Sequence, residues 1–160
     1  MERLWTPWRM AYIKGAERHD ACIFCDFPSQ DPASDEANLI VARGDLSFVI
    51  LNKFPYNTGH VMVAPYRHTG EWESLSPEEL AEITAYSQKS MNALKATLGP
   101  QGFNVGVNQG VTAGAGIADH VHLHVVPRWG GDTNFMTTVG GAKVIPEDLE
   151  TTFARLKPHL

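Results

Sequence analysis

The sequence predicts an α+β fold, in which residues 1–160 form one domain built on an antiparallel β-sheet with one long and one short helix. Two observations predict it. Five short segments have the composition and turn-residue borders of strands, and one long segment between the third and the fourth has helical periodicity. A chain of 160 residues with 43% hydrophobic residues is long enough to bury a core without disulfides.

Turn residues separate the predicted strands, most clearly in Asn52–Gly59 (NKFPYNTG), and a glycine-rich loop separates the last two. The predicted strands are Leu39–Arg43, Leu46–Leu51, His60–Ala64, Phe103–Asn108 and His120–Pro127.

The long helix is predicted over Pro77–Leu98. Ser76 and Glu79 have the spacing of a capping box, Pro77 suits the first helical position, and Gly99 ends the helix. A short helix is expected to begin near Pro146. The chain then divides into an irregular arm at residues 1–37, a core at 38–145 and a C-terminal helix at 146–160.

Composition narrows the class of protein. The net charge of −5 argues against a general nucleic-acid-binding role. The sequence has no apolar run long enough for a transmembrane helix and no signal-peptide pattern, so we expect a cytoplasmic protein without membrane partners.

The strongest motif is His120-Val121-His122-Leu123-His124-Val125-Val126. Because side chains alternate along a strand, the three histidines are expected to share one face, with the apolar residues between them facing a core. The plainer explanation of the motif is an ordinary strand whose polar face happens to consist of histidines. A metal site built from all three is disfavoured, because the outer two Cα atoms of a straight strand lie about 13 Å apart.

A glycine-rich loop, Asn108–Gly116, precedes this strand. Its small residues allow backbone N–H groups to approach a ligand, and such loops bind phosphate oxygens. Loops of this composition are common, so the pattern gains weight chiefly from the neighbouring histidines.

The histidine motif matches the signature of the histidine triad superfamily at every position. Three further segments resemble its diadenosine tetraphosphate phosphorylase-like branch: Arg3–Met10, Asn52–His60 and Arg128–Phe135. The resemblance implies an enzyme that cleaves dinucleoside polyphosphates at the α-phosphate through a histidine–AMP intermediate, with phosphate or water as acceptor. It also implies a homodimer.

The resemblance further implies roles for individual residues. His122 would be the nucleophile, His124 would contact the phosphate, and His60 would orient His122. The nucleotide would be bound by Asn108 and by the backbone of Gly114, Ala115, Gly116 and Ile117. Arg128 either binds polyphosphate or caps the sheet edge.

Two positions depart from the wider superfamily. Asn52 stands where most members have a ribose-binding aspartate, as in the phosphorylase-like branch. Gly116 stands where hydrolases of diadenosine triphosphate have glutamine, which leaves the choice of acceptor open.

Cys22 and Cys25 form a C-x-x-C motif, which suits metal binding, a redox pair or two inert thiols. The resemblance implies that His68 and His120 complete a tetrahedral, structural zinc site with them. The alternative functions are a nucleoside phosphoramidase, a purine-nucleotide-binding module without significant turnover and, with an open metal site, a zinc-dependent hydrolase.

Overall fold

The structure is a computed structural model that describes residues 22–133, 143 and 145–160. The segment Arg3–Met10 and the end of Arg128–Phe135, which contribute to the resemblance above, lie outside the described residues. Among the described helices, none has the length and hydropathy needed to cross a membrane.

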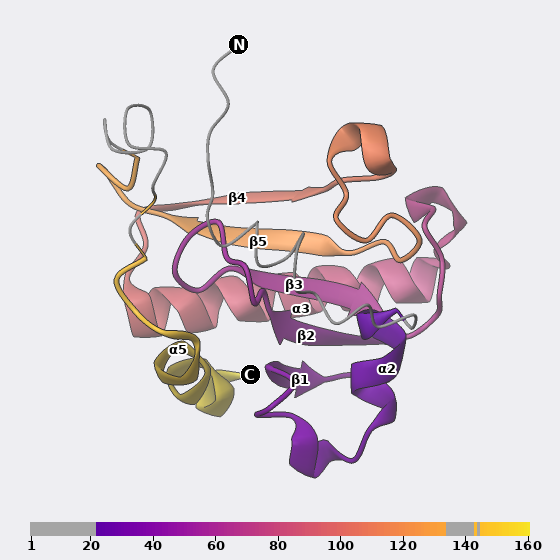
Figure 1. The fold of residues 1–160 in the computed structure, drawn as a ribbon, viewed down its shortest axis with the longest axis horizontal. Coiled ribbons are helices and arrows are strands. Elements are labelled where there is room, and N and C mark those ends of the chain that lie inside the picture. Colours follow the sequence, from indigo (N-terminus) through magenta and orange to yellow (C-terminus); the bar gives the residue numbers. More distant parts are fainter. Residues whose placement is uncertain (1–21, 134–142, 144) are drawn as a thin grey trace, which may run out of the picture.

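Five antiparallel strands form one sheet, as predicted (Figure 1). The order across the sheet is β1-β2-β3-β5-β4, so the histidine-bearing strand β5 lies between β3 and β4. The bounds are β1 Ile40–Arg43, β2 Ser47–Leu51, β3 Val61–Pro65, β4 Gly102–Val107 and β5 Leu123–Arg128.

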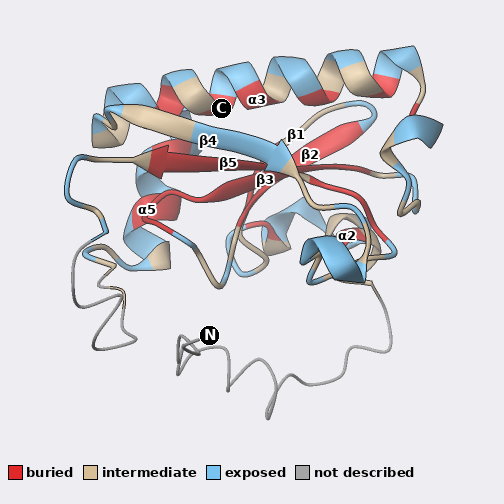
Figure 2. Ribbon diagram, turned by 90° about the horizontal axis from the view of Figure 1, so that it is seen from above, coloured by how far each residue is buried: buried red, intermediate tan, exposed pale blue. Residues whose placement is uncertain are grey.

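Helices cover both faces of the sheet (Figure 2). The long helix α3 (Pro77–Leu98) and the short helix α5 (Leu149–Leu156) pack on one face, against Val49, Leu51 and their neighbours. Helix α2 (Ile23–Ser29) packs on the other face, against Phe48 and Ile50. Side-chain alternation along β2 therefore supplies both halves of the core.

Local signals define the predicted helices well. Both hydrogen bonds of the capping box between Ser76 and Glu79 are present at the start of α3, and Gly99 ends the helix with a left-handed φ of 59°. Asp148 caps α5 by accepting a hydrogen bond from the backbone N–H of Thr151 at 2.7 Å.

The histidine strand is shorter than predicted, because β5 begins at Leu123 rather than His120. The backbone N–H of Val121 donates instead to the carbonyl of Thr69 at 2.7 Å, outside the sheet. Val121 is nevertheless buried in the core beneath α3, so the predicted alternation of histidines and apolar residues is confirmed.

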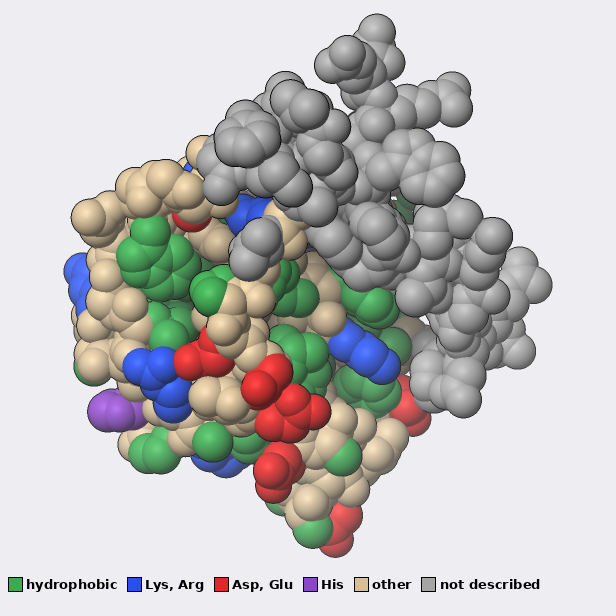
Figure 3. Space-filling view, turned by 60° about the vertical axis from the view of Figure 1, so that its left-hand side comes forward, with side chains coloured by type: hydrophobic (Ala, Val, Ile, Leu, Met, Phe, Trp, Pro, Cys, Tyr) green, Lys and Arg blue, Asp and Glu red, His purple; other side chains and the backbone are tan. Residues whose placement is uncertain are grey.

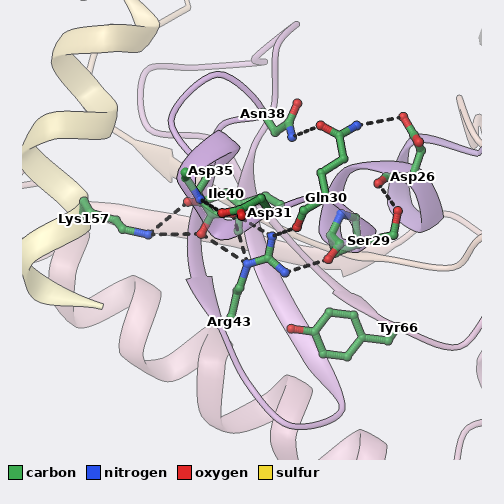
Figure 4. A network of polar contacts seen from close by, with 12 residues as sticks. Asp26, Ser29, Gln30, Asp31, Asp35, Asn38, Ile40, Arg43, Tyr66 and Lys157 are labelled. Carbon is green, nitrogen blue, oxygen red and sulfur yellow. Dashed lines mark hydrogen bonds and ion pairs between the residues drawn. The ribbon is translucent and has the colours of Figure 1, made fainter.

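The prediction of an irregular arm at residues 1–37 is wrong for its described part, residues 22–37. This part contains α2 and a short 3-10 helix at Pro32–Ser34. Asp35, directly after this 3-10 helix, is only 8% exposed. Arg43 on β1 donates to both carboxylate oxygens of Asp35 and to the carbonyl of Pro28 (Figure 4). Lys157 reaches the same carboxylate at 3.7 Å, so one network ties α2 to the sheet and to the C-terminal helix.

Candidate active site and metal centre

His60, His122 and His124 form a buried cluster on the face of the sheet that α2 covers. Their side chains are 0%, 5% and 8% exposed. The imidazole centroids of His122 and His124 lie 4.7 Å apart, and those of His60 and His124 lie 5.1 Å apart. The cluster arises because β3 pairs with β5, with Met62 opposite His124.

The turn before β3 that delivers His60 depends on glycine. Gly59 has a φ of +77°, and a Cβ atom there would lie 2.7 Å from methyl carbons of both Leu94 and Leu98 on α3. A larger residue would be strained at this positive φ and would force either the two leucine side chains or the turn that carries His60 to move.

The backbone fixes the tautomer of His122. Nδ1 of His122 lies 2.8 Å from the carbonyl oxygen of His120. Since a carbonyl oxygen only accepts, Nδ1 carries the proton and donates it. In the neutral ring, Nε2 is then left with its lone pair available.

A different chain of contacts fixes His60 and His124. Nδ1 of His60 accepts the backbone N–H of Tyr56 at 3.1 Å, so the proton of the neutral ring is on Nε2. That Nε2–H donates to Nδ1 of His124 at 2.9 Å. His124 therefore keeps its own proton on Nε2, as a hydrogen-bond donor.

These contacts correct the expectation that His60 orients His122. His60 is hydrogen-bonded to His124, and the tautomer of His122 is set by the carbonyl of His120. The reason is the register of β3 on β5, which brings His60 beside His124.

Burial keeps the imidazoles neutral. Desolvation, together with a smaller effect of the neighbouring imidazoles, lowers the pKa of His60 to about 3. Desolvation likewise lowers the pKa of His124 to about 4 and lowers that of His122. At neutral pH the cluster thus offers one unprotonated nitrogen and one N–H donor side by side.

Two aromatic residues frame the cluster. The ring of Phe24 on α2 is 4.7 Å from that of His122 and 5.3 Å from that of His120. The ring of Tyr56 stacks on His124 at 5.8 Å and is 46% exposed. The sequence predicts no role for Tyr56, and its position in the turn before His60 was the available signal.

The glycine-rich loop connects β4 to the histidine segment. Gly110 and Gly114 adopt positive φ angles of 82° and 92°, which bend the loop around a short 3-10 helix at Val111–Ala113. Gln109 anchors the loop by accepting the backbone N–H of Trp72 at 2.9 Å. The expected nucleotide-binding residues here differ in exposure: Gly114 and Gly116 are exposed, while Asn108, Ala115 and Ile117 are half-buried.

Asn52 and Arg128 have intramolecular partners. The side-chain amide of Asn52 lies 3.4 Å from Nδ1 of His60, which places Asn52 at the cluster. Arg128 makes a two-point ion pair with Asp132 at 2.6 and 2.8 Å and donates to Asn104 at 2.7 Å. It ends β5, while the glycine-rich loop leads to the other end of that strand, so its contacts favour the structural alternative.

Cys22, Cys25, His68 and His120 come together as the resemblance implied. Their ligand atoms all lie within 4.8 Å of one another. The Nδ1 atoms of the two histidines are 3.3 Å apart, and Nδ1 of His120 lies 3.4 and 3.5 Å from the two sulfurs. A tetrahedral zinc site has N···N and N···S edges of about 3.4 and 3.6 Å, so the four residues fit zinc.

The protonation of His120 also fits a metal. Its Nε2 lies 2.8 Å from the carbonyl oxygen of Pro65 and must donate to it. Nδ1 of the neutral ring then directs its lone pair at the cysteines, the arrangement in which a backbone acceptor orients a zinc-bound histidine.

Comparison with known proteins agrees with this geometry. Residues 34–131 match the HIT domain family. The chain is 48% identical over 157 residues to the AP-4-A phosphorylase of Mycobacterium tuberculosis, covering 95% of this chain and 80% of the relative.

Solved structures have the same fold. A Zn-bound histidine triad family protein from Mycobacterium smegmatis superposes with a TM-score of 0.69 at 27% identity, covering 88% of this chain and 93% of that one. A HIT family member from Bacillus subtilis gives 0.61 at 25% identity, covering 87% and 96%. Sequence, fold and the three histidines at and just before the start of β5 agree, and the chain belongs to the HIT domain family.

Proposed function

We propose that the protein is an enzyme that cleaves dinucleoside polyphosphates, of the diadenosine tetraphosphate type, at the α-phosphate. The 48% identity to a protein named AP-4-A phosphorylase supports the substrate class. The observation that carries the mechanism is the tautomer of His122, whose Nδ1–H is held by the carbonyl of His120 and whose Nε2 is left as a nucleophile.

In the first step, Nε2 of His122 attacks the α-phosphorus. A P–N bond forms as the bond to the bridging oxygen breaks, and the nucleoside polyphosphate leaves with the electron pair of that bond. His124, with its proton on Nε2, donates a hydrogen bond to the oxygens on which charge develops. His60 is a positioning residue that fixes the tautomer of His124.

In the second step, an oxygen of inorganic phosphate or of water attacks the same phosphorus. The P–N bond breaks and its electron pair returns to Nε2 of His122. Phosphate as acceptor yields ADP and water yields AMP, while the leaving group from diadenosine tetraphosphate is ATP in both cases. The name of the 48% identical relative favours phosphate.

The glycine-rich loop and two asparagines complete the proposed site. Backbone N–H groups of Gly114, Ala115, Gly116 and Ile117 bind phosphate oxygens, with Asn108 beside them. Asn52, which contacts His60, binds the ribose. Arg128 is held by Asp132, so any contribution to polyphosphate binding is indirect.

Zinc, held by Cys22, Cys25, His68 and His120, has a structural role in this proposal. A closed site with four protein ligands stabilises the fold and leaves no open position for substrate. A zinc-dependent hydrolase would need such an open position, so the proposal does not include that alternative.

Product analysis tests the function. We expect diadenosine tetraphosphate to give ADP and ATP when phosphate is present and AMP and ATP when it is absent. A nucleoside phosphoramidase would instead prefer adenosine 5′-phosphoramidate. A nucleotide-binding module would bind both and turn over neither, which would contradict the proposal.

Two further proposals concern the protein in the cell. Cys22 and Cys25 are placed to bind zinc rather than to form a disulfide, which supports a reducing compartment such as the cytoplasm. A homodimer is supported by β4, an edge strand on which Val105 is 47% exposed.

A further inference from the structure

A cavity of about 420 Å³ lies between the β2–β3 turn and the segment that leads into α5. This volume is in the range of small-molecule sites. Neither the family match nor the expected nucleotide-binding residues account for it. Its walls are largely apolar, and the apolar lining residues are Phe54, Pro55, Ile145, Pro146 and Leu149.

The cavity adjoins the histidine cluster through one short stretch of chain. Asn52 and Tyr56 both contact His60, through a side-chain amide and a backbone N–H respectively. The residues between them, Lys53 to Pro55, line the cavity. Three residues span at most about 10 Å, so this wall of the cavity lies close along the chain to the residues that contact His60.

Two lysines give the cavity its positive charge. Lys53 is exposed and Lys143 is half-buried, and neither forms an ion pair within the described part of the chain. Burial lowers the pKa of Lys143, so an anion beside its amine would restore the charged form that desolvation disfavours.

The acidic residues at the cavity already have partners. Glu147 accepts from Arg155 at 2.6 Å and from Thr152 at 2.8 Å, and Asp148 caps α5. Asp132, the acid that acts on Lys143, is paired with Arg128. Figure 3 shows this side of the molecule, where basic side chains lie next to hydrophobic and acidic ones. Among the described residues that line the cavity, the two lysines are therefore the cations available to bind an anion.

We propose that this cavity is the subsite for the leaving half of the substrate: Lys53 and Lys143 bind its distal phosphates, and the apolar wall holds its base. The inference rests on the proposed function and adds a binding site for the group that departs. Tyr56, which is exposed and stacks on His124, directly follows the cavity residue Pro55 in the chain. A leaving nucleoside triphosphate combines several negative charges with a flat base, which matches lysines beside apolar walls.

The test compares two substrates that share the adenylyl half. Diadenosine tetraphosphate has a large anionic leaving group, whereas adenosine 5′-phosphoramidate loses only ammonia. We expect the double variant Lys53→Gln with Lys143→Gln to raise KM for the tetraphosphate by about tenfold or more, because each lysine supplies a charge-assisted contact. The phosphoramidate kinetics should stay within about twofold. Lys95→Gln, an exposed lysine of α3, removes one positive charge elsewhere and should leave both substrates unaffected.

Binding of inorganic tripolyphosphate, measured by calorimetry, gives a readout without turnover. We expect wild type and Lys95→Gln to bind it alike and the double variant to bind it at least about tenfold more weakly. The subsite would be overturned if the double variant raised KM equally for both substrates, or if it bound tripolyphosphate as tightly as wild type does. A wild type that turns over neither substrate would contradict the proposed function, and tripolyphosphate binding would still decide the role of the cavity.

Discussion

Nδ1 of His122 lies 2.8 Å from the carbonyl oxygen of His120, so a residue of the candidate metal centre sets the tautomer of the candidate nucleophile. The imidazole of His120 faces Cys22, Cys25 and His68, while its backbone faces His122. Phe24, between the two cysteines in sequence, packs on both histidines. The two sites therefore share one stretch of backbone.

Replacing the nucleophile should separate chemistry from binding. We expect His122→Asn to lower turnover of diadenosine tetraphosphate by about a thousandfold or more while nucleotide affinity changes far less, because the covalent route is lost and the pocket remains. Mass spectrometry of rapidly quenched wild type should find AMP on His122. His159→Asn, an exposed histidine near the C-terminus, is the control. Near-normal turnover by His122→Asn would exclude the covalent mechanism.

Metal analysis should find one zinc per chain. We expect Cys22→Ser to lose the zinc and to lower Tm by several degrees, because the metal links α2 to the histidine segment and metal binding contributes folding free energy. Ser29→Ala, at the exposed end of the same helix, should keep the metal. A metal-free wild type that is no less stable than the loaded protein would refute the structural role.

Stability should fall at mildly acidic pH. The folded-state pKa of His60, about 3, lies below its ordinary value of 6.5, so the unfolded chain takes up the proton first. The contribution of neutral His60 to the free energy of unfolding is complete above pH 6.5. It is lost as pH falls toward 3, by on the order of 1 kcal/mol per pH unit. Urea unfolding at pH 7, 6 and 5 measures the loss. His60→Gln should show a shallower decline, and an identical slope would contradict this assignment.

The exposed edge of β4 should mediate self-association. We expect light scattering to give about twice the chain mass of 17.6 kDa. Val105→Lys places a charge on the edge strand and should shift the protein toward monomer. Leu46→Lys, a comparable exposed apolar position before β2, should not. A wild type that remains monomeric at micromolar concentration would refute the dimer.

Signals that lie within one segment were readable from the sequence. The bounds of α3 follow from Ser76, Glu79 and Gly99, which act on their own helix. The alternation of the three histidines with apolar residues was also readable, although only His124 lies within β5. The four candidate zinc ligands required the family resemblance, because nothing local connects Cys22 to His68.

Features that depend on contacts between distant segments were either not predicted from the sequence or predicted wrongly. The partner of His60 depends on the register of β3 against β5, which the sequence does not reveal. Helix α2 is only seven residues long and contains Pro28, so its pattern is weak, and it is held by burial of Phe24. The role of Tyr56 rests on a backbone N–H, which no side-chain motif can indicate.

The network around Asp35 has a consequence for the order of folding. Lys157 donates to the carbonyl of Ile40 across 117 positions of sequence and pairs with the same carboxylate that Arg43 holds. During synthesis, α2 and β1 are made long before Lys157 is added. The segment around α2 therefore gains its Lys157 anchor only after α5 has been made, and until then its attachment depends on Arg43 and on the packing of Phe24.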